Sequence, residues 1–93
     1  MNRPENNNIA LIVDHVFDLI THRLSGQQPE RHLDIGAGWG HLIERLRSQY
    51  PGLKSWGLDY NPSHFPLEDV PIAHCDFSAD RIPHEDGAFD LVT

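Results

Sequence analysis

Glycines at every second position, Gly36, Gly38 and Gly40, constrain this chain more than any other feature. They follow a short apolar run that contains Asp34. Glycine is needed where the backbone approaches a ligand closely or adopts a positive φ, because a Cβ would obstruct either. A helix after the glycines would point its positive N-terminal end at the same place. The run therefore predicts a turn that offers unpaired backbone N–H groups to a nucleotide-like cofactor.

The order of apolar and turn segments predicts an α/β fold. Apolar residues at helical spacing run from Ile9 to about Leu24, and a second helix of about ten residues should follow the glycines. Short strands are expected at residues 31–35, 53–60, 70–75 and 89–92. This alternation is typical of a Rossmann-like parallel sheet sandwiched by helices. Between Pro62 and Pro66 there is room for little more than one helical turn.

Composition narrows the expected partners and compartment. The chain carries 14 acidic and 7 basic residues, a formal net charge of −7, whereas non-specific binding of nucleic acid needs a basic face. The single cysteine, Cys75, is expected to be a buried thiol and favours a reducing compartment. No apolar stretch approaches the ~20 residues of a membrane span. We therefore expect a cytoplasmic protein that does not bind membranes. Its acidity argues against non-specific binding of nucleic acid but does not exclude a nucleic acid substrate.

Acidic residues end the first three predicted strands. Asp34 precedes the glycines, Asp59 closes the second strand, and Asp76 closes the third. Ligands of open parallel sheets bind outside the carboxyl ends of the strands, so these acids should line one edge of one cleft. Asp59 is the residue expected to bind two ribose hydroxyls, because a carboxylate only accepts hydrogen bonds and can accept both.

Other polar and aromatic residues have less specific interpretations. His15, Asp18 and His22 share a helix face opposite the apolar stripe, which favours a solvated surface over a metal site. Trp39 either packs against the sheet or lines the ligand pocket. His41 begins the second helix, beside the predicted cleft.

The glycine spacing discriminates between cofactors. In the dinucleotide-binding fingerprint G-x-G-x-x-G, the last glycine would stand where this chain has His41. The observed D-I-G-A-G-W-G instead resembles motif I of the class I S-adenosylmethionine-dependent methyltransferases. The resemblance continues in order through residues 57–62, 74–77 and 82–92, and it covers about residues 31–93.

The resemblance implies a set of cofactor-binding residues. They are Asp34, Gly36, Ala37, Gly38, Gly40, Asp59, Tyr60, Asp76 and Phe77. By this analogy Asp34 lies near the amino-acid end of the cofactor, and residues 36–38 pass under its methionine and ribose. Asp59 binds the ribose, Tyr60 borders the adenine, and Asp76 and the Phe77 N–H contact the adenine ring. The family usually has a full helix between the second and third strands, whereas only 16 residues separate Asp59 from Asp76 here, so we expect a loop to form the wall of the adenine pocket beside Tyr60.

The implied activity is transfer of a methyl group from S-adenosylmethionine to an acceptor, expected to be a small molecule. No catalytic residue and no metal ligand is assigned within the chain. One alternative is a non-catalytic module that binds S-adenosylmethionine or a nucleotide and regulates a partner. A second is an NAD-type dinucleotide-binding domain, which His41 disfavours. The acceptor and the oligomeric state are not readable from the sequence.

Length and element order predict a single partial domain of 93 residues. Residues 1–30 form an N-terminal helical segment, and residues 31–93 form the cofactor-binding half of a methyltransferase domain. The fourth strand has barely begun at Thr93, so we expect a sheet truncated at the start of that strand. Residues 1–93 alone are expected to be marginally stable and inactive, because the substrate-side loops of the family lie after this strand.

Overall fold

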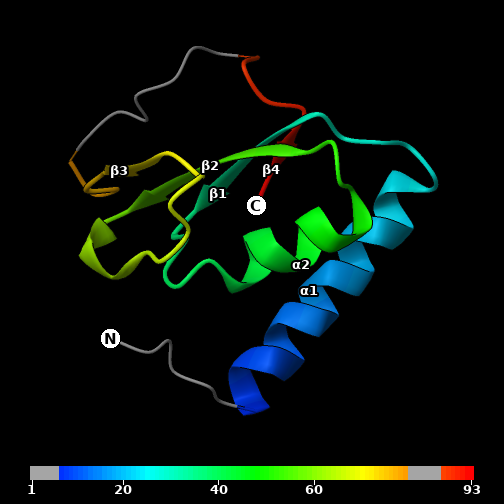
Figure 1. The fold of residues 1–93 in the computed structure, drawn as a ribbon, viewed down its shortest axis with the longest axis horizontal. Coiled ribbons are helices and arrows are strands. Elements are labelled where there is room, and N and C mark those ends of the chain that lie inside the picture. The colour runs from blue at the N-terminus through cyan, green and yellow to red at the C-terminus, as the bar shows by residue number, and fades with distance from the viewer. Residues whose placement is uncertain (1–6, 80–86) are drawn as a thin grey trace.

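A computed structural model describes residues 7–79 and 87–93. The elements occur in the predicted order (Figure 1). They are α1 (Asn7–Leu24), β1 (Arg31–Ile35), α2 (His41–Gln49), β2 (Lys54–Asp59), the 3₁₀ turn η1 (Pro62–His64), β3 (Ile72–His74) and β4 (Leu91–Val92). The predicted second, third and fourth strands are each longer than the observed ones, as is usual for element boundaries read from sequence.

The sheet is parallel throughout, with strand order β3-β2-β1-β4. The predicted Rossmann-like parallel sheet is therefore confirmed. β1 occupies the position where the strand order reverses, since the chain moves outward to β2 and β3 and then returns to the other side of β1. In such sheets the ligand crevice opens at this reversal, outside the carboxyl ends of the strands. The glycine loop leaves β1 at that place.

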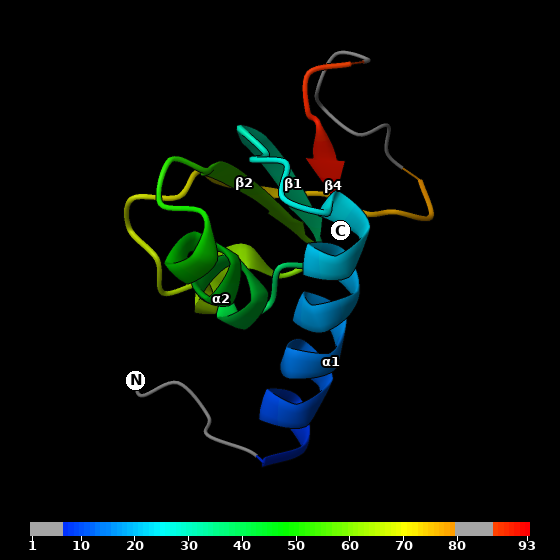
Figure 2. The ribbon, with the colours of Figure 1, turned by 90° about the vertical axis from the view of Figure 1, so that its right-hand side faces the viewer.

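Helices α1 and α2 pack on the same face of the sheet (Figures 1 and 2). Their shared core consists of Phe17 from α1, Leu46 from α2, and Tyr50 and Leu53 after α2. A second buried cluster lies on the other face of the sheet, where a parallel sheet also needs apolar residues. It contains Leu33, Leu58 and Cys75, with Trp56 and Phe89 packed against it. The prediction of a buried Cys75 is confirmed.

The connection between β2 and β3 contains one helical turn, as predicted from its two prolines. Pro62 starts η1, and the Phe65 N–H closes the turn by donating to the Pro62 carbonyl at 3.1 Å. After it, Val70 is buried against Ile43 and Ala37, with Phe65 and Leu67 packed alongside. Apolar loop residues thus cover the part of α2 that a full crossover helix would cover.

The apolar stripe of α1 lies partly against the core and partly outside it. The second half of the helix packs into the core through Phe17, Ile20 and Leu24. The first half extends past the end of α2 (Figure 2), and Ile12 there is 64% exposed. The second half of the stripe therefore belongs to the core, whereas Ile12 in the first half does not. In the ranges that the structure describes, no helix is both long and apolar enough to cross a membrane.

A carboxylate joins the residue before β4 to the start of β1, at the amino-terminal ends of these strands and away from the glycine loop. Asp90 accepts hydrogen bonds from the backbone N–H groups of Glu30 at 3.0 Å and Arg31 at 2.8 Å. These bonds hold the pKa of the Asp90 carboxyl below its usual value. The contact ties the residue before β4 to the start of β1, and the backbone pairing of β4 with β1 places Thr93 beside the site described below.

Candidate functional site

Acceptors at the end of β2 bond to the backbone N–H groups of the glycine loop. Gly36 and Ala37 both donate to the carbonyl of Leu58, at 2.8 and 3.0 Å. Gly38 donates to Oδ2 of Asp59 at 2.8 Å. The prediction of unpaired N–H groups facing a ligand is therefore wrong for these three residues. Their partners lie at the end of β2, so the loop is held in place before any ligand arrives.

The three glycines have different surroundings. Gly36 (φ +74°) has no atom within 4 Å of where a Cβ would stand, and for Gly38 (φ +57°) the nearest is the Gly36 carbonyl at 3.9 Å. Gly40 (φ +78°) faces protein instead, because a Cβ there would lie 2.8 Å from Leu67 Cδ1 and 3.2 Å from Phe65 Cε1. Gly36 and Gly38 thus leave bare backbone beside open space, whereas Gly40 allows close packing.

A pocket of about 280 Å³ lies between the glycine loop and α1. The loop side and β1 contribute Asp34, Gly36, Ala37, Gly38 and Trp39, and α2 contributes His41 and Leu42. Helix α1 contributes Ile9, Ile12, Val13 and Val16. Of the two interpretations of Trp39, the structure supports the pocket lining, and its ring also stacks on His64 with centroids 5.3 Å apart. His41 lies beside this cleft, as predicted.

Asp34 provides a buried carboxyl at this pocket. It is 4% exposed, and one oxygen, Oδ1, accepts a hydrogen bond from the Thr93 hydroxyl at 2.9 Å. Burial raises the pKa of Asp34 to about 6, with a further rise from the neighbouring Asp59 charge and a partial opposing effect of the Thr93 bond. At neutral pH the pocket therefore has the buried Asp34 carboxylate, with Asp59 nearby at the end of β2, an arrangement that a cationic ligand would stabilise.

Asp59 connects the glycine loop to the end of β2. Its Oδ2 accepts from the Gly38 N–H, and its Oδ1 accepts from the Asn61 N–H at 2.9 Å. Each carboxylate oxygen can accept a second hydrogen bond, so both retain capacity for ligand hydroxyls. The backbone bonds orient the carboxylate before binding, which lowers the entropic cost of using it.

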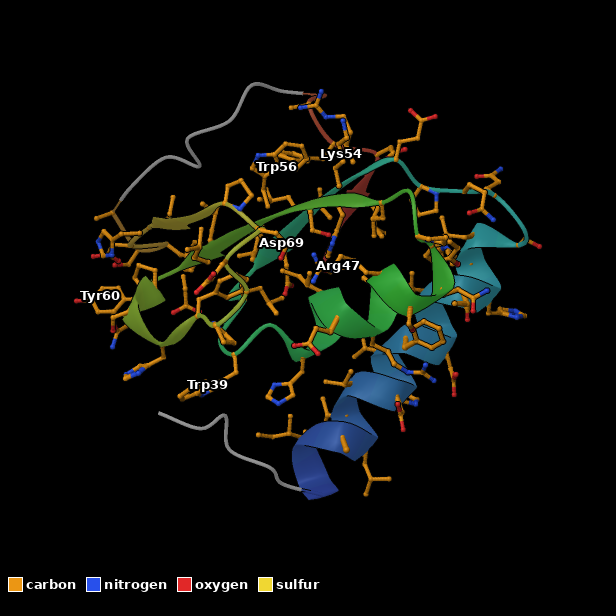
Figure 3. All side chains as sticks on the ribbon, in the orientation of Figure 1. Trp39, Arg47, Lys54, Trp56, Tyr60 and Asp69 are labelled. Atoms are coloured by element: carbon orange, nitrogen blue, oxygen red, sulfur yellow. The ribbon has the colours of Figure 1, made fainter. Side chains whose placement is uncertain are left out.

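Asp76, Phe77 and Tyr60, like Asp59 and Gly40, are not among the residues that line the described pocket. Asp76 accepts from the Ser78 N–H at 3.0 Å and the Ser78 hydroxyl at 2.7 Å, bonds that lower the pKa of its carboxyl and cap the turn after β3. Phe77 is 44% exposed, and Tyr60 is 65% exposed at the edge of the molecule (Figure 3). The structure thus brings Asp34, the loop and Asp59 together and leaves these three residues on a flanking surface.

The sequence did not predict a role for His32, a buried histidine beside the site. His32 has no exposed surface, and its Nδ1 lies 2.9 Å from the Ser55 hydroxyl oxygen while its Nε2 lies 2.8 Å from the Thr93 hydroxyl oxygen. Burial lowers the pKa of His32 to about 4. The sequence does contain one signal: His32 and Asp34 are two residues apart on a strand, so their side chains point to the same face of the sheet.

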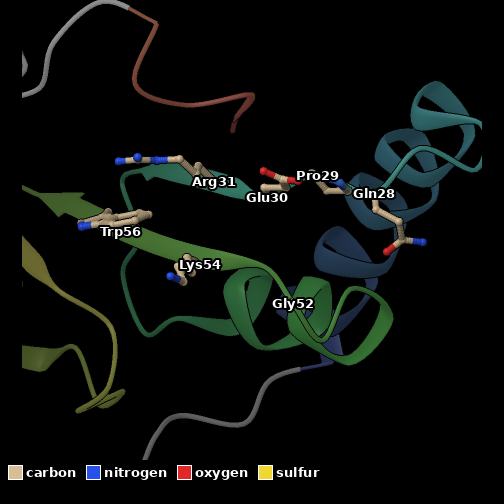
Figure 4. A pocket seen from close by; sticks show the side chains of 7 residues that line it. All are labelled: Gln28, Pro29, Glu30, Arg31, Gly52, Lys54 and Trp56. Carbon is tan, nitrogen blue, oxygen red and sulfur yellow. The ribbon is translucent and has the colours of Figure 1, made fainter.

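A larger hollow, of about 640 Å³, lies at the opposite edge of the sheet (Figure 4). Arg31, Lys54 and Trp56 are among the residues that line it, and the Arg31 guanidinium lies 5.1 Å from the Trp56 ring centroid. It contains neither the glycine loop nor a strand-end acid. Because parallel sheets bind ligands at the carboxyl ends of their strands, we place the functional site at the smaller pocket.

This chain resembles known proteins in its structure. No family model matches the chain, and no curated protein matches it in sequence. Coclaurine N-methyltransferase bound to N-methylheliamine and SAH is similar, with TM-score 0.62 and 18% identity over 86% of this chain and 26% of that chain. A chain of the complex between the Haloferax volcanii Trm112 methyltransferase activator and a putative methyltransferase gives TM-score 0.59 and 22% identity, over 99% of this chain and 47% of that one.

This chain therefore spans about a quarter and about half of the lengths of these two structures. At such low sequence identity, the likeness concerns the backbone and not the side chains of the site. The order of the strands, the glycine loop after β1 and these structural relatives agree with one another. The chain has a Rossmann-like α/β fold that it shares with these two structures.

Proposed function

We propose that this chain binds S-adenosylmethionine in the pocket above the glycine loop and forms the cofactor-binding part of a methyltransferase that acts on a small molecule. The observation that carries the proposal is the bare backbone of Gly36 and Gly38, which faces open space beside the buried Asp34. A ligand can approach this backbone more closely than any side chain would allow. The solved relative that contains SAH supports the choice of cofactor.

The charges of the pocket also fit this cofactor. S-adenosylmethionine has a positively charged sulfonium, which the neighbouring Asp34 and Asp59 would stabilise. NAD has an anionic pyrophosphate, which needs unpaired N–H groups at a glycine loop. The N–H groups of residues 36–38 already bond to Leu58 and Asp59. The two acids therefore favour the sulfonium, and the paired N–H groups disfavour the pyrophosphate.

When bound, S-adenosylmethionine would supply an electrophilic methyl group. The chain's own part would be to hold and orient it: Asp59 accepts from hydroxyls, and the loop backbone gives a fixed surface. The apolar α1 residues Ile12, Val13 and Val16 border the same pocket and would limit the access of water to it. Holding two reactants in line accounts for much of the rate in such transfers. The N-methylheliamine in the solved relative supports a small-molecule acceptor here.

Calorimetric titration of the protein with S-adenosylmethionine, S-adenosylhomocysteine and NAD tests the proposal. We expect both adenosyl ligands to bind at least about tenfold more tightly than NAD, a difference of about 1.4 kcal/mol. Tighter binding of NAD would refute the cofactor assignment. Binding of the adenosyl ligands fits both the cofactor-binding part of a methyltransferase and the non-catalytic module, because residues 1–93 alone are expected to be inactive.

Binding should also depend on pH in a way set by Asp34. Its pKa is raised to about 6, so the carboxyl gains its negative charge as the pH rises through that value. S-adenosylmethionine has one more positive charge than S-adenosylhomocysteine. We therefore expect the ratio of their affinities to shift toward S-adenosylmethionine between pH 5 and pH 7.5, and Asp34→Asn to remove this dependence. A ratio that is flat with pH in the unaltered protein would contradict this role of Asp34.

A further inference from the structure

We propose that His32 and Thr93 are positioning residues for Asp34, which they hold as a hydrogen-bond acceptor through a directed chain that runs from Ser55 through His32 and Thr93. The proposal rests on the proposed function in one respect, because the ligand that Asp34 would meet is the cofactor. The chain of hydrogen bonds itself is a property of the protein without ligand.

The direction of the chain follows from the number of protons available. The Thr93 hydroxyl has one proton, which it donates to Asp34 Oδ1 at 2.9 Å. Its oxygen, 2.8 Å from His32 Nε2, must then accept, so His32 has its proton on Nε2. The lone pair on Nδ1 is left to accept from the Ser55 hydroxyl at 2.9 Å. Every group in the chain is satisfied only with this tautomer while Asp34 is ionised.

The backbone fixes Thr93 in the position that the chain requires. The Thr93 N–H donates to the Leu33 carbonyl at 2.9 Å, and its carbonyl accepts from the Ile35 N–H at 2.9 Å. Thr93 therefore continues the pairing of β4 with β1, directly beside Asp34. Ser55 is held in the same way, because it lies opposite His32 in the pairing of β1 with β2. The pairing of β2, β1 and β4 thus brings together the side chains of Ser55, His32, Asp34 and Thr93, the last of which directly follows β4.

The chain leaves one oxygen of Asp34 for the pocket. Among the described residues, 7–79 and 87–93, the Asp34 carboxyl group accepts a single hydrogen bond, which the Thr93 hydroxyl donates to Oδ1. Asp34 also lines the pocket, so Oδ2 is the oxygen that remains for a ligand. A carboxyl held at one oxygen has a defined orientation, which raises the precision with which the other oxygen can meet a ligand.

Other charged groups near Asp34 also affect its ionisation. Asp59 opposes it from the end of β2, while His41 of α2 shares the pocket and would favour it when protonated. His32 remains neutral at physiological pH because burial lowers its pKa to about 4. The α1 residues at this pocket are apolar. Asp14, an acid of α1, pairs with Arg45 of α2.

Carboxyl ¹³C titration of the protein without ligand tests the role of Thr93. Thr93→Val keeps the shape of the side chain and removes its hydroxyl, whereas Thr93→Ser keeps the hydroxyl. We expect Thr93→Val to raise the titration midpoint of Asp34 by about one pH unit, the size of one hydrogen bond to a charged group, and Thr93→Ser to leave it nearly unchanged. A valine variant that unfolds more easily but titrates like the parent would show a merely structural role and overturn the proposal.

The unaltered protein gives a second test that needs no variant. Long-range ¹H–¹⁵N spectra report the tautomer of His32, and we expect a neutral ring with its proton on Nε2 at pH 7. A proton on Nδ1, or a doubly protonated ring, would overturn the proposal. Both measurements are made without cofactor, so failure of S-adenosylmethionine to bind would refute the proposed function and leave this result standing. Where the cofactor binds, Thr93→Val should weaken it more at pH 6 than at pH 8.

Discussion

Asp59→Ala is expected to weaken S-adenosylmethionine binding about 30- to 150-fold, or about 2–3 kcal/mol. Two interactions are lost together. The ligand loses a carboxylate that accepts from its hydroxyls, and the Gly38 N–H loses its acceptor at 2.8 Å. The second loss releases the loop whose bare backbone faces the pocket. The expected effect is therefore larger than that of one contact to the ligand.

Calorimetry on the folded variant measures this change, and Asp90→Ala is a matched control. Asp90 also accepts backbone N–H bonds, from Glu30 and Arg31, but at the opposite edge of the sheet. Its removal should lower the free energy of unfolding and leave the dissociation constant within about twofold, since it touches no part of the pocket. If Asp59→Ala stays folded and binds as tightly as the parent, Asp59 is not the ribose anchor.

The fold could be predicted from the sequence because its signals are local. The period of the apolar residues in α1 and the prolines around η1 each depend on neighbours along the chain. The parallel sheet followed from the alternation of helices and strands, whereas the order of the strands came only from the structure. The structure confirmed the parallel sheet and the short connection between β2 and β3.

The site could be predicted only in part, because its details depend on contacts between strands. The N–H groups of the loop were expected to face a ligand, but Leu58 and Asp59 of β2 accept from them. No local pattern shows that pairing. Thr93 reaches Asp34 only through the register in which Leu33 pairs with Val92. An apolar stripe likewise shows which face of α1 is buried but not whether core or pocket covers it.

Gly40→Ala is expected to lower the free energy of unfolding by about 2–5 kcal/mol. The positive φ of +78° costs an alanine about 1–2 kcal/mol. Its Cβ would also lie 2.8 Å from Leu67 Cδ1 and 3.2 Å from Phe65 Cε1, and such overpacking costs about 1–3 kcal/mol. These apolar residues cover α2 in place of a crossover helix, so displacing them should loosen the start of α2 as well.

Denaturant unfolding measures this loss, and two other glycines separate its causes. Gly26 has a similar φ of +87° and no atom within 4 Å, so Gly26→Ala should cost only the backbone strain. Equal losses for Gly26→Ala and Gly40→Ala would show that Leu67 and Phe65 yield freely, and that packing does not explain Gly40. Gly38→Ala adds a Cβ toward open space, so it should cost little more stability than Gly26→Ala while abolishing most cofactor binding. That contrast would assign Gly40 to the fold and Gly38 to the ligand, although both stand in one motif.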